Sequence, residues 1–441
     1  MRSPRLLLLA EKECRELLAS RSYWLMLLMI GPLVGHSFIT AVDLYAEASG
    51  IGGGPAALPQ GLSPLDGIMV PTLGAYDLAA TFLFPFVAIR MIAAEKESGA
   101  LKLALQFPSG AGTQLVAKAV IVIAGWLAAL SAGLIATAFW KFYGGHLYAP
   151  EILNLMLGHV LHALLISGVA VAAAALAENA SSAAIVTLGF TVGTWALDFV
   201  AAGRGGLLQN FAKYTPVAAL RTFEQGLPDP GVVIVLLAMG IGGFAVAASW
   251  VRVGGTWKTR AAALTAILIS IGGVSMAASA LRSSRDLSED RRNSFAPADE
   301  EALRQVREPL RVTAYLAPED PRLTDLQRSI LSKLGRVLPR VEVDQVAGGK
   351  TGLFEASEDH YGEIWYEIGG RRAMSRSTIE RVVLEEIYRL AEVAPPSDQA
   401  IEISYSGYPL AVRPRGAAVV FYVIWPLAVA LVWWFQRRPG R

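Results

Sequence analysis

Eight long apolar stretches constrain the fold of this chain more than any other feature of its sequence. A helix needs roughly 20 apolar residues to cross the hydrocarbon core of a bilayer, because its backbone polar groups must be satisfied within the segment. The stretches cover about 22–42, 76–94, 112–140, 153–176, 182–202, 231–251, 261–281 and 417–435. The chain is also 54% hydrophobic and only 17% charged. We therefore predict an α-helical polytopic membrane protein with about eight transmembrane helices.

The positions of lysine and arginine predict the orientation, because short loops rich in these residues stay on the cytoplasmic side. With a cytoplasmic N-terminus, the inner side carries Arg2, Arg5, Lys12, Arg15, Arg21, Lys96, Lys102, Arg252, Lys258, Arg260, Arg437, Arg438 and Arg441. The short outer loops carry only Lys141, Arg204, Lys213 and Arg221. We expect both termini in the cytoplasm and the chain in the inner membrane of a bacterium. The net charge of +2 gives no reason to expect a nucleic-acid partner.

Residues 282–416 lie between the seventh and eighth stretches, and this orientation makes them extracytoplasmic. They contain 20 of the 39 lysines and arginines of the chain. Alternating apolar residues predict strands at 310–316, 341–346, 363–368 and 401–405, and helical periodicity predicts helices at 323–338 and 377–390. The polar stretch 282–301 is typical of a linker. We predict an inserted extracytoplasmic α/β domain at 282–416, between a seventh helix (253–281) and an eighth helix with a basic tail (417–441).

Two charged segments border the first spans. Residues 1–21 mix leucines with charges at positions 11, 12, 13, 15 and 16, which predicts a helix lying in contact with membrane lipid at the inner interface. The alternative is a plain cytoplasmic extension of the first span. The stretch from Glu95 to Leu103 follows the second span, and its apolar side would fit a groove on a cytoplasmic partner. The alternative there is an ordinary inner loop.

The stretch from Glu95 to Pro108 resembles the Glu-Lys/Arg-Glu-x-Gly-Thr-Leu-x-x-Leu-Leu-x-x-Pro stretch of exporter-type (type-2) permeases of ATP-binding-cassette transporters. Ala100 stands where threonine is usual. Residues 214–226 resemble that family's Ser/Thr-Pro…Phe…Gly stretch between spans five and six, and residues 12–22 are typical of its start. The residues that carry the second match are Tyr214, Thr215, Pro216, Leu220, Phe223 and Gly226.

The resemblance covers residues 1–252 and implies a six-helix permease core at 22–252. It implies that a cytoplasmic ATPase subunit contacts Glu95, Lys96, Glu97, Ser98, Gly99 and Leu101. It also implies that Tyr214, Pro216, Phe223 and Gly226 belong to a re-entrant segment at the outer mouth. The chain itself would be no enzyme and bind no cofactor, with ATP and Mg on the ATPase and a second permease copy beside it.

The rest of the chain, with 312–320 and 363–390 as the matching residues, resembles the auxiliary component of gliding-motility-type transporters. That component has an extracytoplasmic α/β domain between two spans. The alternative function is a membrane-anchored signalling or scaffold protein whose outer domain binds an envelope ligand or partner. The sequence Gly348-Gly349-Lys350-Thr351 lacks the first glycine of a phosphate-binding loop, so we do not assign nucleotide binding to it.

Ionisable residues inside a membrane are costly and often functional. We expect Asp77 and Asp198 to line a substrate path, and we expect snorkelling or interfacial placement to explain Arg90, Lys118 and Glu178. His146, His159 and His162 are weak candidates for a metal site. Packing is the favoured explanation for them, because no acid or cysteine cluster accompanies them in the sequence.

Overall fold

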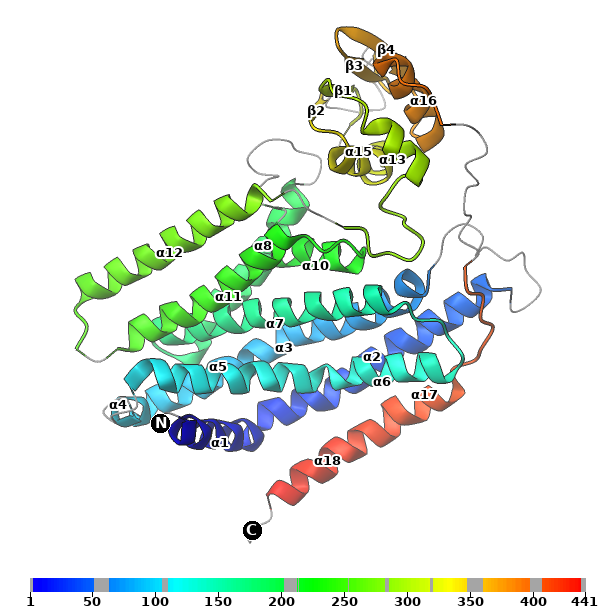
Figure 1. The fold of residues 1–441 in the computed structure, drawn as a ribbon. Coiled ribbons are helices and arrows are strands. Elements are labelled where there is room, and N and C mark those ends of the chain that lie inside the picture. The colour runs from blue at the N-terminus through cyan, green and yellow to red at the C-terminus, as the bar shows by residue number, and fades with distance from the viewer. Residues whose placement is uncertain are drawn as a thin grey trace, which may run out of the picture.

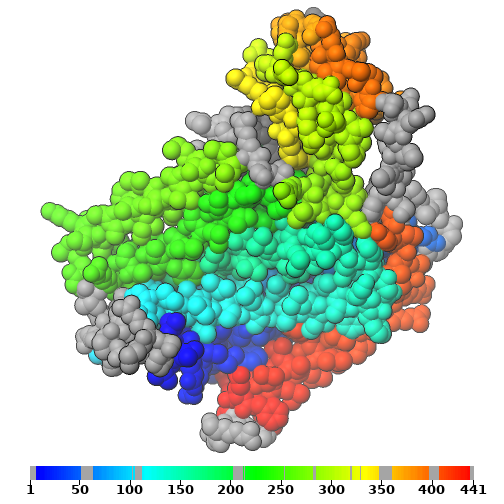
Figure 2. All heavy atoms as spheres, viewed as in Figure 1, coloured from blue at the N-terminus to red at the C-terminus, as the bar shows by residue number. Residues whose placement is uncertain are grey.

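The computed structural model describes residues 3–50, 63–104, 110–201, 212, 214–252, 254–281, 285–317, 320–346, 360–396 and 407–437. Within these residues, eight helical spans are long and apolar enough to cross a membrane, as predicted. They lie side by side in one bundle, and a small α/β unit stands on one end of it (Figures 1 and 2). We call the end of the bundle next to this unit the domain-proximal end and the opposite end the domain-distal end.

Six spans form the body of the bundle, and a break at Leu130 divides the third of them into two helices. They are α2 (Arg21–Ala48), α3 (Val70–Glu97) after a π-helical turn (Leu65–Met69), α5 (Gly110–Ala129) with α6 (Ser131–Phe142), α7 (Ala149–Leu176), α8 (Ala180–Ala201) and α11 (Pro230–Val251). Three shorter helices accompany them: α1 (Ser3–Ala19), α4 (Ala100–Ala104) and α10 (Pro216–Glu224).

The centre of the bundle is packed with aromatic side chains and close helix contacts. Trp126, Tyr76 and Phe84 are among its fully buried residues. Gly168 of α7 faces Gly240 of α11 so closely that a Cβ atom at Gly168 would overlap the Gly240 carbonyl oxygen. Small residues allow such backbone contact, which is a common way for membrane helices to associate. α7 therefore holds the bundle together from its middle.

Two spans lie at the periphery, on opposite flanks of the bundle (Figure 1). α12 (Trp257–Ser279) packs against α11, and the last span, which comprises α17 (Arg415–Val419), a π-helical turn (Val420–Ile424) and α18 (Trp425–Gln436), packs against α2. Leu268 and Ile269 of α12 and Leu427 and Leu431 of α18 are exposed. These surfaces suit contact with lipid tails, because an apolar side chain gains nothing from leaving hydrocarbon.

The α/β unit has a four-stranded sheet in the order β2-β1-β3-β4, with β1 and β2 parallel and the other pairs antiparallel. The strands are β1 (Leu310–Ala314), β2 (Val341–Gln345), β3 (Ile364–Ile368) and β4 (Arg371–Ser375). The helices are α13 (Pro297–Leu303), α14 (Pro321–Asp325) continued by a π-helical turn (Leu326–Leu331) and α15 (Ser332–Val337), and α16 (Glu380–Ala391).

The unit has its own hydrophobic core on one side of the sheet. Val312 and Tyr366 of the sheet are fully buried with Leu334 of α15 and Val383 of α16. Strand β4 was not predicted from the sequence. A two-residue turn at Gly369 and Gly370, both with positive φ, connects it to β3, as is common in tight hairpins. The strand predicted at 401–405 lies outside the described residues.

Candidate functional site

The segment predicted to contact an ATPase begins inside a helix and not in a loop. Glu95, Lys96 and Glu97 form the last turn of α3, and Ser98 and Gly99 connect it to α4. Gly99 has a φ of +76°, a conformation that other residues rarely adopt. The three charged residues therefore lie at the domain-distal end of a long helix, next to other helices of the bundle.

Glu95 is buried in a cluster of charged residues from three helices. Its carboxylate lies 3.0 Å from Lys118 Nζ of α5 and also contacts the ammonium group of Lys12 of α1. Glu13 of α1 lies 2.6 Å from the same Lys118 Nζ. Burial raises the pKa of Glu13, although Lys118 opposes the effect. The cluster ties α1 and the end of α3 to α5.

Of the two explanations expected for Lys118, snorkelling was wrong. Its side chain is only 3% exposed, and its ammonium group also donates to the Met91 carbonyl oxygen at 3.3 Å. A buried ammonium group is costly unless it is paired, and the two carboxylates supply that pairing. The helix α1 also packs against the bundle. Its residues Glu13 and Leu17 are buried there, while Leu7 and Leu8 are exposed.

Lys96 and Glu97 hold the neighbouring connection between α7 and α8. Lys96 Nζ donates to the Ala175 carbonyl oxygen at 3.0 Å, near the C-terminus of α7. The Glu97 carboxylate accepts from the backbone nitrogen of Ala180, the first residue of α8, at 3.4 Å. Both charges have the favourable sign, since helix C-termini attract cations and helix N-termini attract anions.

Of the predicted contact residues, Glu97, Ser98 and Gly99 are the more accessible ones, and Glu95 and Leu101 are buried. Ser98 is exposed and Gly99 is partly exposed, whereas Leu101 is buried. Leu103, on the other side of α4, is 64% exposed. An exposed leucine beside a charged helix end is suited to an apolar groove on another protein. The side chain of Lys102 and the matching residues 106–108 lie outside the described part of the chain.

The second matched segment forms α10, between the spans α8 and α11. The Thr215 hydroxyl caps this helix by accepting from the Ala218 backbone nitrogen at 3.3 Å. Phe223 is fully buried against α7, where Gly158 leaves room for its ring, and Asn154 Nδ2 donates to the Phe223 carbonyl oxygen at 2.8 Å. Gly226 has a φ of +78° just beyond the helix. α10 is thus fixed across the domain-proximal part of α7.

Asp198 and Asp77, which we expected to line a substrate path, both contact basic side chains. Asp198 Oδ2 lies 3.2 Å from Arg221 Nη1 of α10. Asp77 Oδ1 lies 3.4 Å from His162 Nε2 and 3.8 Å from His159 Nδ1 of α7. Asp198 therefore contacts α10, and Asp77 contacts α7, which packs against α10.

One acid accompanies His159 and His162 in the structure, because Asp77 reaches them from α3. Thr81 Oγ1 lies 2.9 Å from His162 Nε2, and His159 is 1% exposed with both ring nitrogens lacking a hydrogen-bond partner in the structure. Burial is the main cause that raises the pKa of Glu224 of α10, which is close enough to Asp77 and His159 to sense their charges. This is a buried polar cluster among three helices.

The three histidines do not converge on one metal position. His146 lies apart from the other two, and its Nε2 is 2.9 Å from the Glu289 carboxylate. In the described residues, one group of acids has ligand atoms close enough to share a metal ion, namely Glu13, Glu16 and Glu95. Ammonium groups of Lys12 and Lys118 already contact these carboxylates, so a further cation there would be repelled.

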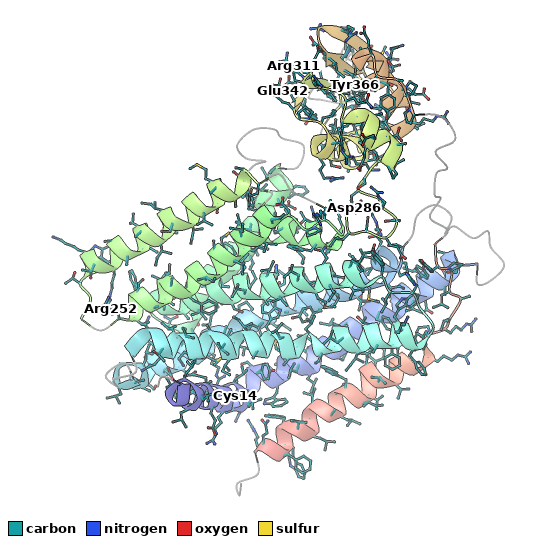
Figure 3. All side chains as sticks on the ribbon, viewed as in Figure 1. Cys14, Arg252, Asp286, Arg311, Glu342 and Tyr366 are labelled. Atoms are coloured by element: carbon teal, nitrogen blue, oxygen red, sulfur yellow. The ribbon has the colours of Figure 1, made fainter. Side chains whose placement is uncertain are left out.

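The stretch 282–301 was predicted to be a linker, but its described part is attached to the bundle. The Leu287 backbone nitrogen donates to the Gly226 carbonyl oxygen at 2.9 Å, and Asn293 Nδ2 donates to the Gln225 carbonyl oxygen at 2.7 Å. Asp286, at the base of the α/β unit in Figure 3, accepts from the Asn293 backbone nitrogen at 3.0 Å. We call residues 285–294 the attachment segment.

Arg292 is the most connected residue of the attachment segment. Its guanidinium forms an ion pair with Asp66, just before α3, and donates to the Ser63 hydroxyl at 2.5 Å. It also lies 2.9 Å from the Asp290 carboxylate and 3.7 Å from that of Glu151 at the start of α7. Burial is the largest cause that raises the pKa of Asp290. The polar character of the segment therefore reflects partners on the bundle.

The return segment, residues 407–414, is attached at the same place. The Tyr408 hydroxyl donates to Glu289 Oε1 at 2.9 Å, and its ring stacks on His146 with centroids 3.6 Å apart. Tyr45 of α2 donates to the Tyr408 carbonyl oxygen at 2.8 Å. Glu289 thus joins the attachment segment, the return segment and the loop before α7.

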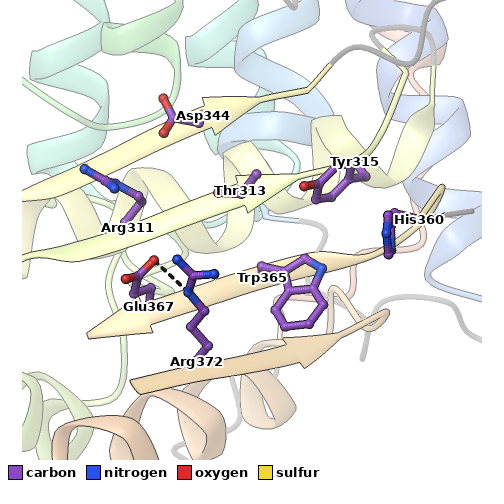
Figure 4. Close-up of a pocket in the computed structure, with 8 residues that line it drawn as sticks. All are labelled: Arg311, Thr313, Tyr315, Asp344, His360, Trp365, Glu367 and Arg372. Carbon is purple, nitrogen blue, oxygen red and sulfur yellow. Dashed lines mark hydrogen bonds and ion pairs between the residues drawn. The ribbon is translucent and has the colours of Figure 1, made fainter. Parts of the chain in front are cut away.

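The face of the sheet that points away from the core carries a pocket of about 390 Å³ (Figure 4). Charged side chains lie at one end of it, where Arg372 Nε donates to Glu367 at 3.1 Å. Aromatic side chains lie at the other end, where the rings of Tyr315 and His360 are 5.7 Å apart. A pocket with mixed charge and aromatic walls is suited to a polar ligand or a peptide.

A scan against protein-family models finds no match to the chain, and a search of curated proteins finds none that is significantly similar. The contacts that the sequence did not predict join residues far apart in the chain, such as Glu13 with Lys118 and Asp77 with His162. What the sequence does show is an ionisable residue within an apolar stretch, which needs a partner because it is costly when unpaired. The sequence does not show which residue is that partner.

Proposed function

We propose that this chain is the permease subunit of an ATP-binding-cassette exporter, with ATP hydrolysed by a separate cytoplasmic subunit. The observation that carries the proposal is the construction of the domain-distal end. Leu103 is exposed on α4, directly after a helix end whose charges are tied to α1, α5, α7 and α8. Force applied to α4 would reach α1 and α5 through buried ion pairs, whose disruption is costly. It would reach α7 and α8 through the hydrogen bonds of Lys96 and Glu97.

The proposal includes the orientation deduced from the charge count. The domain-distal end, with α1 and α4, would face the cytoplasm of a bacterium, and the α/β unit would lie outside the cytoplasmic membrane as a domain of the gliding-motility type. A second copy of the chain would complete the pathway. α10 would then lie at the outer mouth, and the polar cluster of Asp77, His159 and His162 beneath it would give a substrate polar contacts on its way.

Co-purification with an ATP-binding-cassette ATPase from the same genome tests the proposal. We expect the wild-type pair to co-purify and the chain to alter the ATPase rate. Replacing an exposed leucine that anchors an interface loses about 1.5–3 kcal/mol, so Leu103→Arg should weaken the complex at least tenfold. Leu153→Arg is the matched control, because Leu153 is 70% exposed at the other end of the bundle.

If neither the wild-type chain nor its variants bind or regulate such an ATPase, the exporter proposal is wrong. The alternative is a membrane-anchored signalling or scaffold protein, which is favoured by the pocket on the open face of the sheet. It predicts that Trp365→Ala and Arg311→Ala impair ligand or envelope-protein binding, while changes at Leu103 have no effect.

A further inference from the structure

A recess of about 340 Å³ opens at the domain-distal end, between the C-terminus of α1, the start of α2 and the last turns of α3. Glu16 and Ser20 line it from α1 and the α1–α2 junction, and Arg90, Ala94, Glu95 and Ser98 line it from the last turns of α3 and the C-cap of that helix. The recess adjoins α4, because Ala100 also lines it, but neither Leu103 nor the buried cluster at Asp77 belongs to its lining. It combines a cation, an unpartnered hydroxyl and a helix N-terminus.

Arg90 provides the cation. It is exposed, and no hydrogen bond or ion pair joins it to any residue that the structure describes. It lies seven residues before Glu97, the end of α3, which corresponds to about 10 Å along the helix axis. A guanidinium at that depth is at the level of lipid headgroups, where a phosphate is the most abundant anion.

Ser20 and the start of α2 provide donors for the same anion. The Ser20 side chain is 8% exposed, and its hydroxyl has no partner in the structure. Ser20 occupies the N-cap position of α2 without making the usual cap hydrogen bond. The first backbone N–H groups of a helix lack intrahelical acceptors and attract anions, so the N-terminus that begins at Arg21 is also available.

The two acids that line the recess, Glu16 and Glu95, are already paired with lysines. Glu16 lies 3.2 Å from Lys12 Nζ, and Glu95 is shared by Lys12 and Lys118. Burial alone would lower the pKa of Lys12. The hydrogen bond to Glu95 and the nearby carboxylates outweigh burial and raise this pKa, so the ammonium group of Lys12 stays charged. None of the three carboxylates of the cluster contacts Arg90.

An apolar stripe continues from Arg90 along the exposed face of α3. Leu78, Phe82 and Phe86 are all exposed and recur every four residues, which places them on one side of the helix together with Arg90. A lipid with its phosphate at Arg90 would lay an acyl chain along these side chains. The stripe therefore specifies an amphipathic ligand and not a free inorganic anion.

We propose that the recess between Ser20 and Arg90 is a binding site for an anionic phospholipid. Arg90 and Ser20 hold the phosphate near the N-terminus of α2, and Phe86 and Phe82 contact an acyl chain. The site requires only that the chain lies in a membrane, so it does not depend on the exporter function proposed above.

Native mass spectrometry of the purified full-length protein tests the site. The wild type, Arg90→Gln and Arg252→Gln are each incubated with equal amounts of phosphatidylglycerol and phosphatidylcholine, and bound lipids are counted. Arg252 is the matched control because it is exposed at the end of α11 (Figure 3), and α11 contributes no residue to the lining of the recess. We expect wild type and R252Q to retain phosphatidylglycerol preferentially, and R90Q to retain roughly tenfold less of it.

Equal retention of phosphatidylglycerol by R90Q and the wild type would overturn the proposal, as would an absence of preference in the wild type. If R90Q changes the oligomeric state and leaves lipid retention unchanged, the recess belongs to an interface between copies and the lipid site is wrong. If R90Q does not fold, a salt titration of the wild type decides: retention that does not fall with ionic strength contradicts recognition of phosphate by Arg90.

Discussion

The two ends of the bundle use charged side chains in different ways. At the domain-distal end, Glu13, Glu95 and Lys118 come from the bundle's own helices and are buried among them. At the domain-proximal end, Glu289 and Arg292 come from the inserted segment and contact residues of the bundle from outside. The first arrangement makes separate helices act as one body, and the second fixes an added domain to that body. The two ends should therefore respond differently to the loss of a charge.

The largest effect is expected at the domain-distal end, from Lys118→Met. The variant leaves Glu13 and Glu95 buried with Lys12 as their remaining cation in the cluster, and breaking a buried pair in this way costs about 3–5 kcal/mol. Thermal unfolding in detergent should show a markedly lower midpoint than for the wild type. Glu97→Gln serves as the control, because Glu97 is exposed and should change the midpoint little. A wild-type midpoint for K118M would mean that the cluster does not stabilise the bundle.

At the domain-proximal end, Arg292→Met should loosen the attachment segment without unfolding the bundle. Hydrogen bonds to charged groups contribute about 1.5–3 kcal/mol each, so amide exchange in residues 285–294 should become roughly ten- to a hundredfold faster. Arg291→Met is the control, since Arg291 is half exposed and its nearest carboxylate, Glu300, is 3.8 Å away. The contrast between the two ends fails if exchange across α2, α3 and α7 rises as much as in the segment itself.

A smaller effect is expected from Thr215→Ala, which removes the cap of α10. Loss of an N-cap side chain costs about 1 kcal/mol, so backbone amides in the first turn of α10 should exchange about fivefold faster. The control is Thr222→Ala, whose hydroxyl bonds only within the helix, to the Ala219 carbonyl oxygen. Unchanged exchange at Ala218 in T215A would show that packing of Phe223 alone fixes the helix.

The smallest effect is confined to low pH and to the α/β unit. The hydrogen bond from Arg322 lowers the pKa of Asp320 to about 2, with the Tyr361 hydroxyl contributing as a further donor. The stabilisation by this carboxylate is complete above the ordinary aspartate pKa of about 4 and is lost as pH falls toward 2. Amide exchange in β1 should therefore rise more steeply between pH 4 and 2 in the wild type than in Asp320→Asn. Parallel profiles would exclude Asp320 as the cause.

The spans could be predicted from the sequence because each depends on the composition of one continuous segment. The same holds for β1, β2 and β3, for the helical stretch 321–337 and for α16, whose apolar periodicity lies within one segment. α13 is the exception, because it begins in the stretch that the sequence predicted to be a linker. The charged contacts could not be located in this way. Lys118 has the same sequence context whether it reaches water or Glu13, and the choice depends on where α1 packs. Similarly, the polar residues around Arg292 look like a linker until Asp66 and Glu151 are placed beside them.

Glu95 illustrates the practical cost of this limit. In the sequence it is the first charge of the matched segment and the natural residue to reverse in a test of coupling. In the structure it is buried between two lysines, so its reversal would damage folding before it revealed anything about a partner. Leu103, which the sequence did not single out, is the accessible residue.

The contact between Glu289 and Tyr408 has a consequence for how this protein can be altered. The inserted domain leaves the bundle and returns to it at one point, so the two ends of the segment 290–407 lie close together. Foreign domains are tolerated best where their ends lie close together, because the host chain is then neither stretched nor forced apart. This position is therefore a natural junction for exchanging modules. A replacement with adjacent termini should leave the eight spans assembled, and would turn the membrane portion into a carrier for whatever is joined to it.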